Sequence, residues 1–119
     1  MLATEQLPLD VRVEMWVTDL CEALEKDYER SYPNSSHKKE FRCQAGRKYW
    51  KINQQDVEED GKIWSGGVHA FIDKKTGDVF KAAAWSAPAK GVRYNILTQT
   101  ETVLKRAGND GGFGGYLYR

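Results

Sequence analysis

The sequence lacks long apolar runs, paired cysteines and a secretion signal. Its uninterrupted apolar stretches are only a few residues long, against the ~20 residues that a membrane-spanning helix needs. The first 14 residues carry acids where a signal peptide would have a basic region and an apolar run, so we expect neither membrane insertion nor export. Cys21 and Cys43 form no CxxC motif, which predicts two free thiols in a reducing cytoplasm.

The motifs of common enzymes and metal sites are absent as well. The sequence contains no GxSxG, HExxH or P-loop motif and no paired-carboxylate arrangement. His69 is the only histidine in a predicted strand, and Asp73, four residues further, would lie ~13 Å away along an extended chain. The acidic run at 55–61 lacks the spacing of a calcium loop, and His37 has no companion ligands. We therefore expect no catalytic residue, no metal and no cofactor, with His69 buried or on a strand face.

Length and composition fit one globular domain. The chain has 119 residues, of which 40% are hydrophobic and 29% charged. The net charge is +1, but residues 1–30 carry −5 and residues 31–119 carry +6. A basic body beside an acidic helix can bind a polyanion on one side. The alternative is an ordinary solvated surface.

An amphipathic helix is predicted near the N-terminus, from about Leu9 to Arg30. Pro8 suits its first turn, and apolar residues recur at three- and four-residue spacing. The stripe consists of Val13, Val17, Leu20, Leu24 and Tyr28. The following segment, SYPNSSHKKE, predicts a loop. We expect one domain over 1–119, with 1–45 as helix and loop and 46–119 as sheet, second helix and tail.

Three antiparallel strands are predicted at 47–54, 68–73 and 78–85, since these segments alternate bulky and polar groups. Gly77 supplies the positive φ that the turn between the last two strands needs. Alternation places Val68, Ala70 and Ile72 on one face, and His69 and Phe71 on the other. Pro88 and Gly91 should end the sheet.

A second helix is predicted from about Gln99 to Ala107, with a capping box at Thr98 and Glu101 and a stop at Gly108. Residues 116–118 predict a short last strand or an aromatic tail on the sheet. The fold class is α+β: a long N-terminal helix, a three- to four-stranded antiparallel sheet and a short second helix, in the order α-β-β-β-α. The expected core consists of Trp16, Leu20, Leu24, Trp50, Ile52, Val68, Ala70, Ile72, Phe80, Val103 and Leu104.

Four separated blocks resemble a group of small proteins encoded by tailed bacteriophages. The blocks are KYWKI, VHAFIDKKTGDVFKAAAW, APAKGVRYN and GGYLYR, in this order between Arg47 and Arg119. The acidic connector at 55–61 and the GGFGGYLYR ending depart from that pattern. The resemblance implies a phage protein acting in the host bacterial cytoplasm. That group has no assigned function, so no site residue carries over.

Binding of nucleic acid or another polyanion is the leading functional hypothesis. Cations and one aromatic residue gather on the predicted hairpin and on the loop that follows it, where phosphates could be held and bases stacked. The candidate site consists of Lys74, Lys75, Lys81, Trp85, Lys90 and Arg93. Tyr94, Trp50 and Phe71 are further stacking candidates. The element order also matches the double-stranded-RNA-binding domain, although Thr98 and Glu101 stand where that domain has lysines.

A protein-interaction module is the alternative. The acidic helix and the apolar groups on both sheet faces favour a host protein as partner, or self-assembly, for instance as a homodimer. The sequence leaves the oligomeric state open. Both hypotheses describe a non-enzymatic binding protein with no membrane partner.

Overall fold

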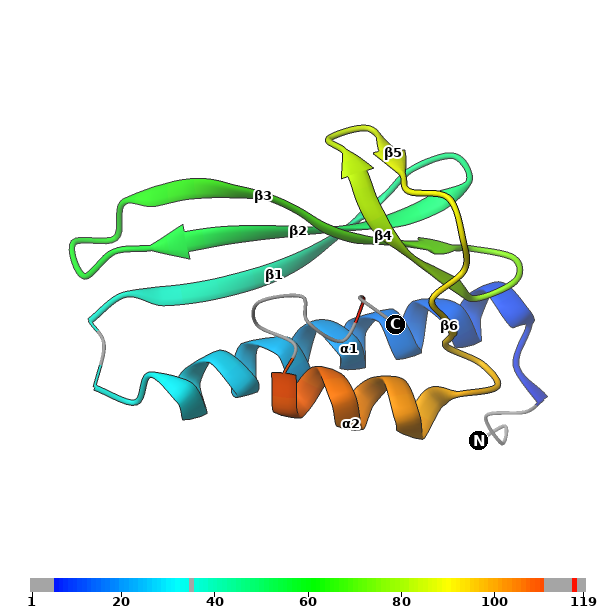
Figure 1. Cartoon of the computed structure of the whole chain (residues 1–119), viewed down its shortest axis with the longest axis horizontal. Helices are drawn as coiled ribbons and strands as arrows, with labels where there is room; N and C mark the ends of the chain where they lie inside the picture. Colours follow the sequence, from blue (N-terminus) through cyan, green and yellow to red (C-terminus); the bar gives the residue numbers. More distant parts are fainter. Residues whose placement is uncertain (1–5, 35, 111–116, 118–119) are drawn as a thin grey trace.

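The computed structural model describes residues 6–34, 36–110 and 117. Two helices lie on one face of a six-stranded sheet (Figure 1), so the predicted α+β class is confirmed. The sheet is larger than the three or four strands expected. The elements are α1 (Leu9–Ser31), β1 (Lys38–Ala45), β2 (Tyr49–Val57), β3 (Ile63–Asp73), β4 (Asp78–Ala84), β5 (Ala87–Pro88), β6 (Tyr94–Asn95) and α2 (Thr100–Asp110).

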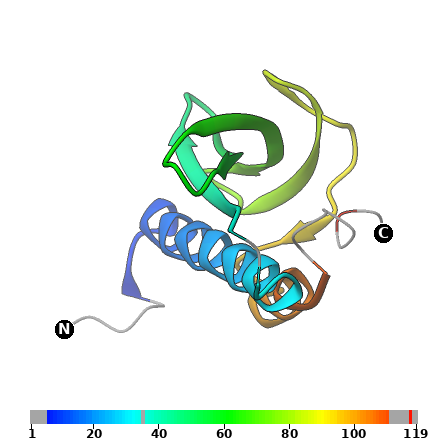
Figure 2. The same ribbon diagram turned by 90° about the vertical axis from the view of Figure 1, so that its left-hand side faces the viewer.

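The sheet is an antiparallel meander in the order β1-β2-β3-β4-β5, with β6 paired to β4. Figure 2 shows that it curls above the two helices. α2 packs against α1 and contacts the sheet through β6. At the helix ends, the Arg30 guanidinium donates to the Gly108 carbonyl and pairs with the buried Asp27 at 2.7 Å.

β1 corrects the prediction that residues 31–45 form a loop after the first helix. Only Phe41 of this strand is buried, so the segment lacks an apolar alternation. The strand exists because all eight residues pair with β2, from Lys38 opposite Val57 to Ala45 opposite Trp50. α1 closes part of its outer edge, since the Phe41 N–H donates to the Glu25 carboxylate at 2.9 Å.

Several other boundaries differ from the prediction. β2 extends through Val57 and β3 begins at Ile63, which shortens the acidic connector to a turn. Pro88 does not end the sheet: it lies in β5, an edge strand where its missing N–H is tolerated. The sheet has six strands, so the fold does not match the three-stranded double-stranded-RNA-binding domain with which the predicted element order was compared.

The second helix begins and ends later than predicted, and a hydrogen-bonded turn precedes it. The side-chain oxygen of Asn95 accepts the N–H groups of Leu97 and Thr98, and the Gln99 side chain accepts the N–H of Asn95 at 2.8 Å. This reciprocal pair closes the turn directly before α2, which begins at Thr100. α2 then continues through Gly108 to Asp110.

The β3–β4 turn follows the prediction closely. Gly77 has φ +79° and is buried beneath Leu97 and Ile96, with Leu97 Cγ 3.0 Å from where a Cβ would stand. Its N–H donates to Asp73 O at 2.9 Å, and its carbonyl accepts the Ile96 N–H at 2.8 Å. A side chain here would meet both an unfavourable backbone conformation and a filled space.

One core joins α1, α2 and the sheet, and it contains most of the predicted residues. Leu20, Leu24, Ile52, Ala70, Ile72 and Val103 are buried in it, and Trp16, Trp50 and Leu104 pack at its edge. Val68 and Phe80 are not in it. Core members outside the predicted list are Val13, Val17, Cys21, Phe41, Val79, Tyr94, Ile96, Ala107 and Leu117. The predicted last strand at 116–118 lies outside the described residues except for the buried Leu117.

Candidate polyanion-binding site

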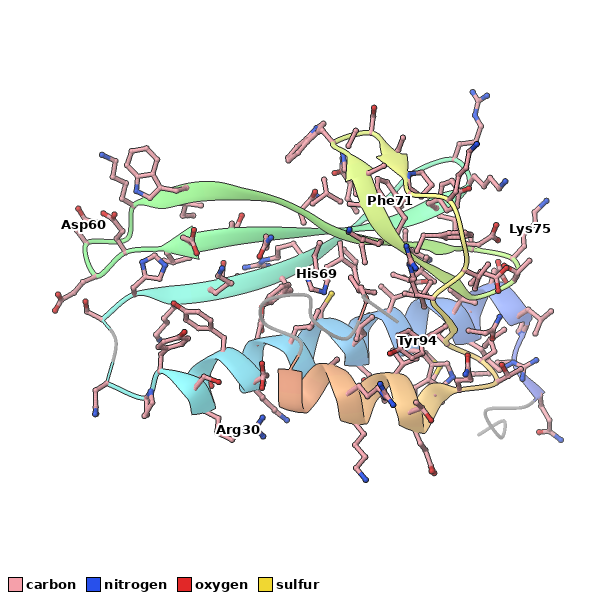
Figure 3. All side chains as sticks on the ribbon, in the orientation of Figure 1. Arg30, Asp60, His69, Phe71, Lys75 and Tyr94 are labelled. Carbon is pink, nitrogen blue, oxygen red and sulfur yellow. The ribbon has the colours of Figure 1, made fainter. Side chains whose placement is uncertain are left out.

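The meander brings two basic turns to the same end of the sheet. The β1–β2 turn at 46–48 and the β3–β4 turn at 74–77 meet there because successive antiparallel hairpins return to one end. A hydrogen bond from the Lys74 N–H to the Lys48 carbonyl, 3.0 Å long, joins them directly. Lys75 projects outward at this end in Figure 3.

Four cations line a pocket of about 480 Å³ at this end: Arg47, Lys48, Lys74 and Lys75. We call them the basic end. Asp10, Asp73 and Thr76 complete the lining. None of the four cations is within ion-pair distance of a carboxylate that the structure describes. The pocket therefore carries an excess of positive charge over its two acidic groups.

Asp73 stabilises the lysine-bearing turn and also attracts Lys48, one of the four cations. One carboxylate oxygen accepts the N–H groups of Lys75 at 2.8 Å and Thr76 at 3.0 Å. Burial raises the pKa of Asp73, but these N–H bonds together with the charge of Lys48 outweigh burial, so the net pKa lies below its usual value. The ionised carboxylate thus fixes the turn on which Lys74 and Lys75 stand.

Two of the four cations lie over aromatic rings. Lys74 Nζ is 5.0 Å from the ring centroid of Trp50, and Lys48 Nζ is 5.3 Å from that of Tyr49. Such contacts restrict the long side chains and leave their charge available to a ligand.

A second, aromatic pocket adjoins the basic end on the sheet face turned away from the helices. The register places Lys51 opposite Phe71, and Phe71 opposite Phe80, so the three share this face. The Tyr49 ring meets Phe71 and Phe80 edge-on, with centroids 5.8 and 5.9 Å apart. The pocket holds about 290 Å³ and is lined by Gln44, Ala45, Gly46, Arg47, Lys48, Tyr49, Lys51, Phe71 and Ser86.

The structure does not gather the six predicted residues on one surface. Lys74 and Lys75 lie at the basic end, and the exposed Trp85 follows β4, with Lys51 Nζ 4.3 Å from its ring centroid. Lys81 lies on the opposite face from Phe80, opposite the buried Ala70. Lys90 is exposed in the loop after β5.

Arg93 lines a separate pocket of about 470 Å³ with Val92, Tyr94, Asn95 and Gln99. Of the further stacking candidates, Tyr94 is only 1% exposed and belongs to the core, whereas Phe71 lines the aromatic pocket. Trp50 is half-buried at the core edge beneath Lys74.

Arg47, Lys48 and Lys51 are the site residues that sequence reasoning missed. Arg47 and Lys48 line both pockets and connect them. The available signal was the Gly46-Arg47-Lys48 segment, a glycine followed by two cations directly before an aromatic strand. Lys74 and Lys75 are 26 or more residues away from this segment in the sequence, so spacing alone could not join the two turns.

His69 is buried on the helix side of the sheet, not on the face predicted by alternation (Figure 3). The pairing shifts between Ile52 opposite Ala70 and Asn53 opposite Val68, so His69 is the extra residue of a bulge. Its ring meets Phe41 edge-on at a centroid distance of 5.3 Å. Burial, and to a lesser extent Lys39, lowers the pKa of His69 to about 4, so the ring is neutral near pH 7.

The arrangement can attract anions and stack flat groups. Within the described residues, no three His, Cys, Asp or Glu side chains gather as a metal site would require. Over the same residues, no helix combines the length and the apolarity needed to cross a bilayer. The protein is thus an α+β domain with a basic sheet end beside an aromatic pocket.

The chain belongs to a family of unknown function, DUF7717, whose match extends over residues 3–119. No curated protein and no solved structure matches the chain.

Proposed function

We propose that this protein is a non-enzymatic, phage-encoded binding protein of the host cytoplasm that holds nucleic acid or a similar polyanion at the basic end. The observation that supports this proposal is the meeting of two turns that carry four cations without a described ion-pair partner. Cations concentrated in this way raise the local concentration of a polyanion and the rate at which it associates.

Acidic side chains on other parts of the molecule also favour the basic end as the place where a polyanion binds. The β2–β3 turn, at the far end of the sheet, carries the exposed acids Glu58, Glu59 and Asp60. The exposed side of α1 adds Glu14, Asp19, Glu22 and Glu29. These acids make the far end of the sheet and the exposed side of α1 less favourable for a chain of phosphates than the basic end.

The proposal predicts how strongly the affinity for nucleic acid should depend on salt concentration. If all four cations contact phosphates, the slope of log K against log salt should be about −3 for a single strand and −4 for a duplex. The affinity should then fall about 50- to 150-fold between 50 and 200 mM salt.

The test compares two variants that each lose four positive charges. The first variant replaces the four cations of the basic end by alanine: Arg47, Lys48, Lys74 and Lys75. The control variant replaces four exposed cations elsewhere by alanine: Lys26, Lys38, Lys62 and Arg106. Fluorescence polarisation with labelled DNA and RNA should show at least tenfold weaker binding and a nearly flat salt slope for the first variant only. Equal losses in both variants would refute the basic end as the site, and no binding by the native protein at low salt would refute the function.

A protein-interaction surface at the opposite end is the second candidate. Ile63 and Trp64 begin β3 beside the acidic turn and are 58% and 50% exposed. An exposed apolar pair next to acids fits a partner with a basic rim around an apolar groove. Size-exclusion light scattering and host-lysate pull-downs with Ile63→Ser/Trp64→Ser would identify a self-association or a partner that depends on this pair; identical results with native protein and variant would exclude it.

A further inference from the structure

The aromatic pocket beside the basic end is suited to a flat ligand group. Its floor combines the ring of Phe71, 4% exposed, with the half-buried Tyr49 set edge-on against it. Its volume of about 290 Å³ lies just below the range for drug-sized ligands, roughly 300–1,000 Å³. The opening is thus large enough for one ring system but not for a folded segment.

An exposed indole stands next to this pocket. Trp85 is 56% exposed and directly precedes Ser86, a lining residue. Lys51 Nζ, also in the lining, lies 4.3 Å from the Trp85 ring centroid. A base that enters the pocket can stack on the tryptophan, and the lysine charge lies beside both.

The pocket is continuous with the cations of the basic end. Arg47 and Lys48 line the aromatic pocket and the basic pocket alike. A nucleotide whose base lies against Tyr49 and Phe71 would therefore place its phosphates beside those two cations. Bases in a duplex are stacked and paired, so only an unpaired base can enter.

We propose that the ligand is single-stranded nucleic acid, with one base in the pocket of Tyr49, Phe71 and Lys51, against Trp85, and its phosphates on Arg47 and Lys48. This inference rests on the proposed function and specifies its ligand. Stacking of one base on an aromatic side chain corresponds to about a 5- to 140-fold gain in affinity.

The experiment separates base recognition from charge. Fluorescence polarisation at low salt compares a labelled mixed-sequence single strand, its duplex and linear polyphosphate, which has charge but no bases. The single strand should bind at least tenfold more tightly than the other two.

The variant Trp85→Ala should weaken single-strand binding by about 5- to 140-fold and leave polyphosphate binding unchanged. Trp64→Ala is the matched control, because Trp64 is 50% exposed and also lies beneath a lysine, with Lys62 Nζ at 4.5 Å. It should bind all three ligands as the native protein does.

Two outcomes overturn the inference in different ways. If the three ligands bind alike and the two tryptophan variants behave alike, base recognition is refuted, while polyanion binding stands. If none of the ligands binds the native protein, the inference and the proposed function fall together.

Discussion

The buried His69 should make the folded state sensitive to acid. Its side chain lies on the helix side of the sheet against the ring of Phe41, is 7% exposed, and has a pKa lowered by burial and by Lys39 from 6.5 to about 4. In the unfolded chain the same imidazole gains its proton near pH 6.5. Between those two values the unfolded state binds a proton that the folded state excludes, so the free energy of unfolding falls as pH decreases.

The size of this effect follows from the two pKa values. Each pH unit costs about 1.4 kcal/mol, so acidification from pH 6.5 to 4 should cost about 3 kcal/mol. That is a large share of the ~5–15 kcal/mol that stabilises a typical domain. The stability is fully present above pH 6.5 and is lost towards pH 4.

The assay compares urea unfolding of the native protein and His69→Gln at several pH values from 7 to 4. Glutamine stays neutral over this range, so the native protein should lose about 3 kcal/mol more than the variant. Carboxylates such as Glu40, whose pKa the Gln55 amide lowers, are present in both proteins and cancel in the difference. An NMR titration of the native protein should place the His69 pKa near 4, and it remains decisive if the variant does not fold. Parallel losses in the two proteins, or a midpoint near 6.5, would refute the reasoning.

Two further predictions concern the core and the thiols. Leu20→Ala and Ile72→Ala, both at fully buried positions, should each cost about 2–5 kcal/mol in thermal or urea unfolding; losses below about 0.5 kcal/mol at both sites would contradict the core assignment. Cys43 is exposed on β1, whereas burial, with smaller contributions from Cys43 and Glu25, raises the pKa of Cys21 from 9.0 to about 12. An alkylating reagent at pH 8 should therefore modify Cys43 well before Cys21, which should react readily only after denaturant is added; equal rates measured by mass spectrometry would show that Cys21 is not shielded.

The sequence predicts α1 well because its apolar stripe alone determines which face is buried. Val13, Val17, Leu20 and Leu24 recur at helical spacing and all lie in the core. The β3–β4 turn is predicted equally well, because Gly77 supplies the φ that it requires. In both cases the determining residues are close together in the sequence.

β1 and the candidate site depend on contacts between distant residues. The polar sequence KKEFRCQA becomes a strand only because β2 supplies backbone partners. His69 changes face because of a bulge against β2, which alternation within β3 cannot reveal. Arg47 and Lys48 meet Lys74 and Lys75 only when β1, β2 and β3 are paired. The predicted site therefore included Lys74 and Lys75 but omitted Arg47 and Lys48 on the neighbouring turn.

The opposite charges at the two ends of the sheet also limit how a ligand can lie. The meander returns the β1–β2 and β3–β4 turns to the basic end and sends the β2–β3 turn to the other end. Glu58, Glu59 and Asp60 outnumber Lys62 at that turn, so a phosphate chain that followed the strands would meet repulsion. In the proposed complex, the phosphate chain crosses the sheet end from Lys74 and Lys75 over Arg47 and Lys48 to Trp85. The bound segment should therefore be short. An oligonucleotide longer than this segment should bind more tightly only because it offers the protein more positions at which to bind, not because it makes new contacts.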